Sequence, residues 1–105
     1  MHMEADEPVY VIRGGRRTEV ERRFLVSFDF QRLHRGGRAA VYRVLYGRRV
    51  QVNGRTYRYP GLLHEGARRL GQSVFAMDEG QANRLVAMLR KHRVPHTEWK
   101  AFLPR

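Results

Sequence analysis

Apolar and polar residues alternate most regularly over residues 19–30 of the chain. A period of two predicts a long β-strand, because successive side chains of a strand point to opposite faces. The short apolar run at residues 8–13 predicts a first strand, and Gly14-Gly15 between the two runs predicts an antiparallel hairpin. We expect the face with three phenylalanines to contact the core; its members are Val20, Arg22, Phe24, Val26, Phe28 and Phe30.

A second hairpin is predicted at residues 46–59, whose sequence is YGRRVQVNGRTYRY. Asn53-Gly54 between two alternating runs is typical of a type I′ turn, which requires positive φ at both central residues. The turn fixes the register, so paired residues project from the same side. The predicted pairs are Val52 with Arg55, Gln51 with Thr56, Val50 with Tyr57, Arg49 with Arg58, and Arg48 with Tyr59.

Shorter patterns predict the remaining extended segments. Residues 39–47 are rich in β-branched and aromatic residues, which predicts a central strand that leads into the second hairpin. Residues 73–77 and 96–103 are interpreted as two further strands. Residues 31–38 form a basic connection with Gly36-Gly37, interpreted either as a mobile phosphate-binding loop or as a solvated turn. Residues 62–72 fit a short helix or a loop.

The clearest helix signal lies at residues 79–93. Asp78 is a suitable N-cap, and Gln81 three positions later completes a capping box. Basic residues crowd the carboxyl end, where the helix dipole favours them, and Pro95 follows. An apolar stripe is formed by Ala82, Leu85, Val86 and Leu89.

These elements predict an α+β fold, a mainly antiparallel sheet of about five or six strands with one amphipathic helix (79–93) packed on one face. The 105 residues are enough for a single core but too few for two. We expect an acidic tail at residues 1–7 and one basic nucleic-acid-binding domain at residues 8–105.

The distribution of charge indicates the function of the protein more clearly than any sequence motif does. The net charge is +11, and three of the ten acidic residues lie in residues 1–7. Residues 30–69 contain ten arginines and a single acid, Glu65. Such an excess repels itself in a compact domain and indicates a polyanionic partner. All lysine and arginine positions except Lys91 and Lys100 are arginine. The planar guanidinium of arginine presents a pair of N–H donors whose geometry matches a phosphate group.

Other features narrow the class of protein. The chain has no cysteine, which excludes disulfides, thiolate metal sites and thiol nucleophiles. No stretch approaches 18 apolar residues, so we expect no membrane interaction and a cytoplasmic location.

Tyrosines interleaved with arginines suggest a nucleic-acid interface, since guanidinium groups can follow phosphates while aromatic rings stack on bases. Alternatively, these tyrosines are partly buried core residues. The predicted binding residues are Arg35, Arg38, Tyr42, Arg43, Tyr46, Arg48, Arg49, Arg55, Tyr57, Arg58, Tyr59, Arg68, Arg69, Arg90, Lys91 and Arg93.

Adjacent arginines at 22–23 and 48–49 raise a question of burial. Neighbouring residues of a strand point to opposite faces, and an unpaired buried guanidinium is very costly. Either an acid pairs with the inward arginine, with Glu19, Glu21 and Asp29 as the nearby candidates, or both faces of the sheet are wet. Charge on several faces favours a protein embedded in folded RNA.

Signals for catalysis are weak. His92 and His96 are four residues apart, but Pro95 between them breaks the helical geometry of a metal pair. His64-Glu65 and Asp29 have no second carboxylate at a suggestive spacing, and no phosphate-binding glycine motif occurs. We therefore expect no enzyme, no metal, no cofactor and no small-molecule substrate.

In charge and size the chain resembles the small basic proteins of ribosomes. The sequence predicts a non-enzymatic RNA-binding protein, ribosomal or ribosome-associated, with RNA favoured over DNA and ribosomal proteins as further partners. One alternative is a single-stranded DNA-binding or chromatin protein. A second is an interaction module for an acidic protein.

Overall fold

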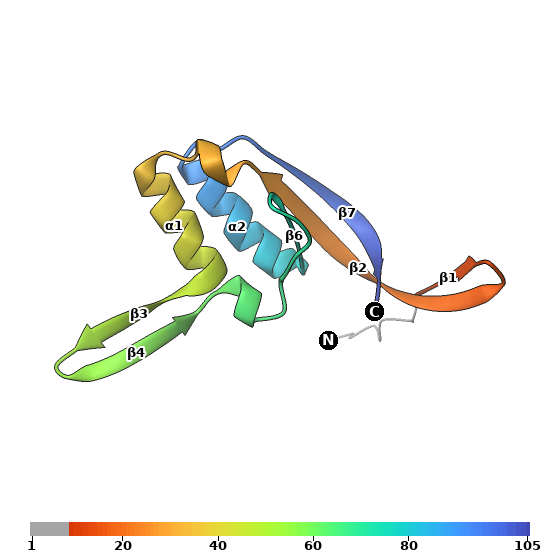
Figure 1. Cartoon of the computed structure of the whole chain (residues 1–105), viewed down its shortest axis with the longest axis horizontal. Coiled ribbons are helices and arrows are strands. Elements are labelled where there is room, and N and C mark those ends of the chain that lie inside the picture. The colour runs from red at the N-terminus through yellow and green to blue at the C-terminus, as the bar shows by residue number, and fades with distance from the viewer. Residues whose placement is uncertain (1–8) are drawn as a thin grey trace, which may run out of the picture.

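A five-stranded antiparallel sheet forms one layer of the structure, and two α-helices lie side by side on one of its faces (Figure 1). This computed structural model describes residues 9–105. The acidic tail predicted at residues 1–7 lies outside the described residues. The α+β class is confirmed, although the prediction of one helix is wrong: the described residues contain α1 as well as α2.

Strand β2 (Arg16–Phe28) is the centre of the sheet. Its first part pairs with β1 (Val9–Arg13), and its second part has β6 (Val74–Met77) on one edge and β7 (His96–Pro104) on the other. The short β5 (Arg68–Arg69) extends the sheet beyond β6. The strands predicted at 73–77 and 96–103 are confirmed, as is the strand predicted at 8–13 over its described residues, 9–13.

The second predicted strand, 19–30, is confirmed with shifted ends. It begins at Arg16 because the Gly14-Gly15 turn brings β1 alongside it. It ends at Phe28 because the Asp29 carboxylate accepts a hydrogen bond from the Gln31 backbone N–H at 3.0 Å. This bond starts the 3-10 turn η1 (Phe30–Arg32).

Helix α1 (Arg35–Tyr46) replaces the central strand predicted at 39–47, which is wrong. It also includes the second half of the basic connection predicted at 31–38, so that prediction is wrong from Arg35 onward. The His34 ring caps the helix, since its Nδ1 accepts the Gly37 backbone N–H at 3.0 Å. Val41 and Leu45, one turn apart, are fully buried. Burial of this stripe outweighs the β-propensity of the segment.

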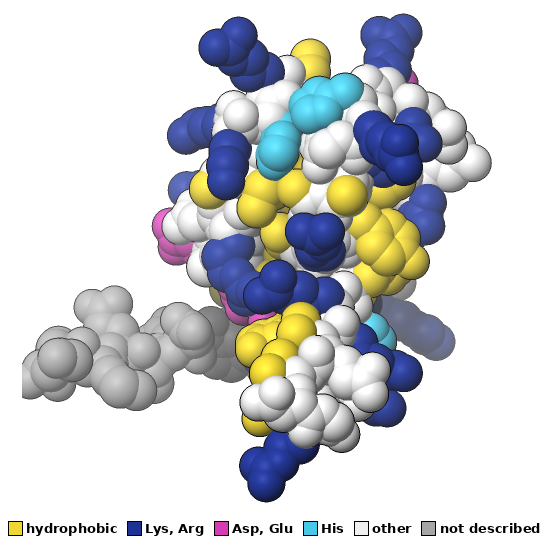
Figure 2. Space-filling model, turned by 90° about the vertical axis from the view of Figure 1, so that its left-hand side faces the viewer, with side chains coloured by type: hydrophobic (Ala, Val, Ile, Leu, Met, Phe, Trp, Pro, Cys, Tyr) yellow, Lys and Arg dark blue, Asp and Glu magenta, His cyan; other side chains and the backbone are white. Residues whose placement is uncertain are grey.

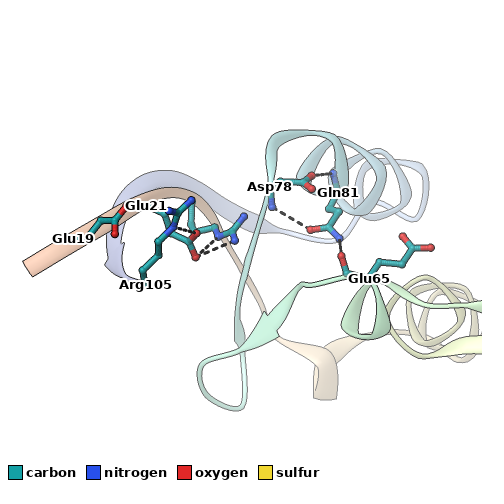
Figure 3. Close-up of polar contacts among 7 residues, drawn as sticks. Glu19, Glu21, Glu65, Asp78, Gln81 and Arg105 are labelled. Carbon is teal, nitrogen blue, oxygen red and sulfur yellow. Dashed lines mark hydrogen bonds and ion pairs between the residues drawn. The ribbon is translucent and has the colours of Figure 1, made fainter. Parts of the chain in front are cut away.

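Helix α2 (Glu79–Lys91) confirms the predicted helix, and both bonds of the capping box are formed. Asp78 accepts the Gln81 backbone N–H at 2.8 Å, and the Gln81 side-chain oxygen accepts the Asp78 backbone N–H at 3.1 Å. The Gln81 amide also donates to the Glu65 carbonyl at 2.8 Å, which ties the loop before β5 to the helix (Figure 3). All four predicted stripe residues, Ala82, Leu85, Val86 and Leu89, are buried.

The core lies between the sheet and the two helices. Val26, Phe28, Phe75 and Met77 enter it from the sheet. Val41 and Leu45 come from α1, and the stripe of α2 fills the other side. Residues 62–72, left open between helix and loop, form the 3-10 turn η2 (Leu62–His64), a loop and β5.

Two hairpins project from opposite ends of this body (Figure 1). One is the tip formed by β1 and the start of β2. The other consists of β3 (Gly47–Val52) and β4 (Arg55–Pro60), which form a separate two-stranded sheet. The Cα extents of 56 × 33 × 28 Å reflect these projections. Within residues 9–105, no helix is both long enough and apolar enough to cross a membrane.

Candidate nucleic-acid interface

Residues 47–60 form a projecting hairpin, referred to below as the arm. The predicted register is confirmed at every pair, from Val52 opposite Arg55 at the tip to Arg48 opposite Tyr59 at the base. Asn53 and Gly54 have φ values of 51° and 77°, the positive values that a type I′ turn requires. The arm does not continue the main sheet, contrary to the predicted central strand.

Both faces of the arm meet solvent. One face carries Val50, Tyr57 and Tyr59, of which the two tyrosines are 45% and 50% exposed. The Arg48 guanidinium lies over the Tyr59 ring, 5.0 Å from its centroid. Arg49 and Arg58 share the other face, with both side chains exposed. The arginine pair 48–49 is therefore accommodated because both faces are wet.

The four arginines of the arm have no carboxylate partner within 4.0 Å among residues 9–105. Four of the seven acids among residues 9–105 form ion pairs elsewhere. The ion pairs join Arg23 to Glu21, Arg32 to Asp29, Arg84 to Glu65, and Arg105 to Glu19 and Glu21. Figure 2 shows the arm end of the molecule, where dark-blue basic side chains cover much of the surface and magenta acids occupy small areas.

Glu21 in β2 is one of the acids that form ion pairs away from the arm. Burial raises the pKa of this carboxyl, but hydrogen bonds and charge from Arg23 and Arg105 outweigh that effect and hold the pKa below its ordinary value. The Arg23 Nη2 lies 2.9 Å from Glu21 Oε1, so an acid pairs with one of the two adjacent arginines. The other, Arg22, is exposed on the opposite face of β2.

The base of the arm is held by close backbone contact. A Cβ built on Gly61 would collide with backbone atoms of Leu45, Tyr46 and Gly47. Gly47 has a φ of 83° and ends α1, so the chain turns directly from the helix into the arm. This contact fixes the arm against the carboxyl end of α1.

Two hollows flank the base of the arm. The first, of about 550 Å³, is named the arm-base hollow and is lined by Tyr46, Gly47, Arg48, Arg49, Arg58, Tyr59, Pro60 and His64. The second, of about 370 Å³, lies between the two helices and is named the interhelical hollow. It is lined by Ala40, Arg43, Val44, Arg48, Tyr59, Pro60, Arg84, Met88, Lys91 and His92. Arg48 and Tyr59 belong to both hollows, so the positive surface is continuous.

A third hollow, of about 760 Å³, lies on the other side of α1 and is named the tyrosine hollow. It meets the arm-base hollow at Tyr46, which lines both. Its walls come from the end of β2, α1, the loop between β5 and β6, and the start of β7. The lining residues are Ser27, Phe28, Asp29, Phe30, Gln31, Tyr42, Leu45, Tyr46, Arg69, Gln72, Ser73, Phe75, Pro95, His96 and Thr97.

Most of the predicted binding residues line these three hollows or the arm. They are Tyr42, Arg43, Tyr46, Arg48, Arg49, Arg55, Tyr57, Arg58, Tyr59, Arg69 and Lys91. Tyr42 and Tyr46 reach the surface from a helix rather than from the predicted strand. Tyr46 also packs against the core, whereas Tyr42, Tyr57 and Tyr59 are exposed, so the alternative of partly buried core tyrosines applies to Tyr46 alone.

The remaining predicted residues lie apart from the arm. Arg35 and Arg38 are exposed on the first turn of α1, where Arg38 donates to the Gln31 carbonyl at 3.1 Å. Arg90 and Arg93 are exposed at the carboxyl end of α2. Arg68 pairs with Ala76 on the sheet face opposite to that of Arg69, so the pair at 68–69 is divided between two surfaces.

Two histidines join the helix ends at the margin of this surface. The rings of His34, which caps α1, and His92, which follows α2, lie 5.6 Å apart. His96 lies in β7, so His92 and His96 do not share a helix, as Pro95 predicted.

Sequence reasoning missed the polar rim of the tyrosine hollow, which consists of Gln31, Gln72, Ser73, His96 and Thr97. These residues come from three separate segments, and no spacing in the sequence connects them. It also missed His64 and Arg84, which line the hollows at the base of the arm. Within the described part of the chain, no group of three metal-ligating side chains gathers.

Comparisons with known proteins add no relative: no family model, no curated protein and no solved structure matches the chain.

Proposed function

We propose that this protein is a non-enzymatic RNA-binding protein of the cytoplasm, a component or companion of the ribosome. The observation that carries the proposal is the unpaired charge of the arm. Arg48, Arg49, Arg55 and Arg58 have no carboxylate partner among residues 9–105, and Arg49 and Arg58 lie opposite each other. Phosphate groups would neutralise both charges and remove their repulsion.

Because both faces of the arm are exposed to solvent, folded RNA is favoured as the binding partner over a partner that would contact only one face. Exposed tyrosines on one face can stack on unpaired bases, while arginines on both faces can bind phosphates. A ribbon of this kind fits within folded RNA, where phosphates approach from several directions. The continuous hollows at its base extend the positive surface onto α1 and α2.

Single-stranded DNA and duplex DNA are the nearest rivals, since the major groove of B-DNA also admits a two-stranded ribbon. The test is to measure affinity for ribosomal RNA, single-stranded DNA and duplex DNA at several salt concentrations. Tighter binding to RNA, weakening steeply with salt, is expected. Tighter binding to DNA would favour the chromatin alternative, and binding to neither would contradict the proposal.

Sedimentation of native lysate through sucrose, with and without ribonuclease, tests the ribosomal part. We expect the protein to migrate with a ribosomal subunit and to be released by ribonuclease. Capture of an acidic protein that survives nuclease treatment would support an interaction module instead.

A further inference from the structure

The tyrosine hollow has the dimensions and the lining of a site for a small flat ligand. Its volume of about 760 Å³ lies within the range of about 300–1,000 Å³ typical of such sites. Its apolar floor is rigid, because the Phe28 and Phe75 rings are buried and stack at a centroid distance of 5.6 Å with an interplanar angle of 15°. This hollow was not expected from the sequence.

One wall is an aromatic platform. Tyr42 and Tyr46 are one helical turn apart on α1, and their ring centroids are 4.5 Å apart with an interplanar angle of 31°. The inner tyrosine packs against the core, while Tyr42 is 52% exposed. A ring supported from behind and open in front is suited to stacking on a base.

A fixed guanidinium stands beside this platform. Arg69 Nε donates to the Gly71 carbonyl at 2.9 Å, and its Nη2 donates to the Gln72 carbonyl at 3.3 Å. Its Nη1 donates to the Tyr46 hydroxyl at 3.4 Å. Three of its N–H groups are thereby engaged, and two others remain for a ligand. Since the guanidinium is held before binding, little side-chain entropy is lost on contact.

The rim offers both donors and acceptors. The His96 Nδ1 lies 3.0 Å from the Val94 carbonyl oxygen, to which it must donate, so Nε2 is left for a ligand. Gln31, Gln72, Ser73 and Thr97 supply amides and hydroxyls. Asp29 adds a carboxylate, which disfavours a phosphate deep in this hollow but can accept from an N–H group of a base.

We propose that the tyrosine hollow binds one unpaired base of an RNA strand, stacked on Tyr42, while the neighbouring phosphates lie on the arm-base hollow. The two hollows meet at Tyr46, so one strand can reach both. This inference rests on the proposed RNA-binding function and adds a base-dependent contact to it. A free nucleotide carries the same flat base as an RNA strand. The experiment below distinguishes binding of an RNA strand from binding of a free nucleotide.

The test compares a uridine dodecamer with the same ribose-phosphate chain lacking all of its bases. Binding of the full-length protein is followed by fluorescence anisotropy for the wild type, Tyr42→Ala, Tyr42→Phe and Tyr10→Ala. Tyr10 is a matched control, because it is an exposed tyrosine on β1 at the opposite end of the molecule.

We expect Tyr42→Ala to weaken binding of the base-bearing strand by about 5- to 100-fold, as for loss of one stacked base. Its affinity for the strand without bases should stay within about twofold of the wild-type value. Tyr42→Phe and Tyr10→Ala should bind like the wild type. Thermal unfolding of Tyr42→Ala near the wild-type temperature would confirm that the loss is not a folding defect.

Three outcomes overturn the inference. Equal weakening on both strands, or no weakening, would show that Tyr42 does not stack on a base, while the RNA-binding function stands. Uridine monophosphate that binds as tightly as the dodecamer would identify a small-molecule site. If the wild type binds neither strand, the proposed function itself fails and the inference fails with it.

Discussion

Arg49 and Arg58 lie directly opposite each other on the two strands of the arm, both exposed and on the same face. Like charges in this position destabilise a strand pair by a few tenths to about 1 kcal/mol. No acid among residues 9–105 lies within ion-pair distance of either guanidinium. Residues 9–105 therefore leave a repulsion that a polyanion would remove.

Replacing both residues with serine is expected to leave thermal stability unchanged or slightly raised, because the repulsion disappears and no contact is lost. Arg13 and Arg16 provide a control, since they also face each other across the two strands of a projecting hairpin, at the other end of the molecule. The same double change there should be equally harmless to folding. A large fall in the unfolding temperature of the Arg49/Arg58 variant would show that these arginines are structural.

Gly61 tests how the arm is attached. Its φ of −88° suits any residue, so the obstacle to a side chain is the backbone of residues 45–47 alone. We expect Gly61→Ala to cost about 1–3 kcal/mol, as overpacking does. Gly71→Ala is the control, because nothing lies within 4 Å of a Cβ at that position. Equal stability of the two variants in denaturant titrations would contradict the close approach.

Leu85 and Leu89 test the docking of α2 on the sheet. Both are fully buried in the core, so either leucine changed to alanine should cost about 2–5 kcal/mol. Leu70 is 49% exposed, and Leu70→Ala should change the free energy of unfolding by less than about 0.5 kcal/mol. Urea denaturation measures all three, and a small loss at Leu85 or Leu89 would contradict the packing.

We expect the ion pairs of Glu21 to make the stability of the fold depend slightly on pH. Its pKa is lower in the folded protein than its ordinary value, despite burial, because Arg23 and Arg105 favour the charged form. The carboxylate thus stabilises the fold above its ordinary pKa, and the contribution is lost as pH falls through the lowered pKa.

Melting temperatures of the wild type, Glu21→Gln and Glu98→Gln between about pH 7 and about pH 2 test this expectation. The gap between the wild type and Glu21→Gln should close at low pH. Glu98, which forms no ion pair with the described residues, should show little gap at any pH. A gap at Glu21 that stays constant or widens on acidification would contradict the ion pairs.

Local chemistry made much of the fold predictable. The Asn53-Gly54 turn specified the register of the arm pair by pair, because a two-residue turn with both φ values positive allows only one alignment. The capping box at Asp78 and Gln81 located the start of α2 to the residue. Both signals act within a few residues of chain and need no tertiary information.

Helix α1 was not predictable in the same way. Its β-branched and aromatic residues favour a strand, and Gly36-Gly37 suggested a loop. Gly37 is instead buried at a helix contact, where an added Cβ would lie 3.3 Å from the Cβ of His92. The spacing of Val41 and Leu45 was a helical signal, but only the packing against α2 and the sheet makes it decisive.

The candidate site was partly predictable for a related reason. The arginines and tyrosines of the arm are close in sequence, so their proximity followed from the hairpin alone. The tyrosine hollow depends on segments around residues 30, 44, 70 and 96, which only the topology brings together. Its aromatic residues were noticed in the sequence, whereas its polar rim was not.

The salt dependence of RNA binding tests most directly whether phosphates neutralise the charge of the arm. The measurement is the slope of log K against log salt concentration for the wild type and the Arg49→Ser/Arg58→Ser variant on ribosomal RNA. Loss of two phosphate contacts should make the slope shallower by about 1.4 on single-stranded segments, at about 0.7 per contact. An unchanged slope, or binding that does not depend on salt in the wild type, would contradict the proposed role of the arm.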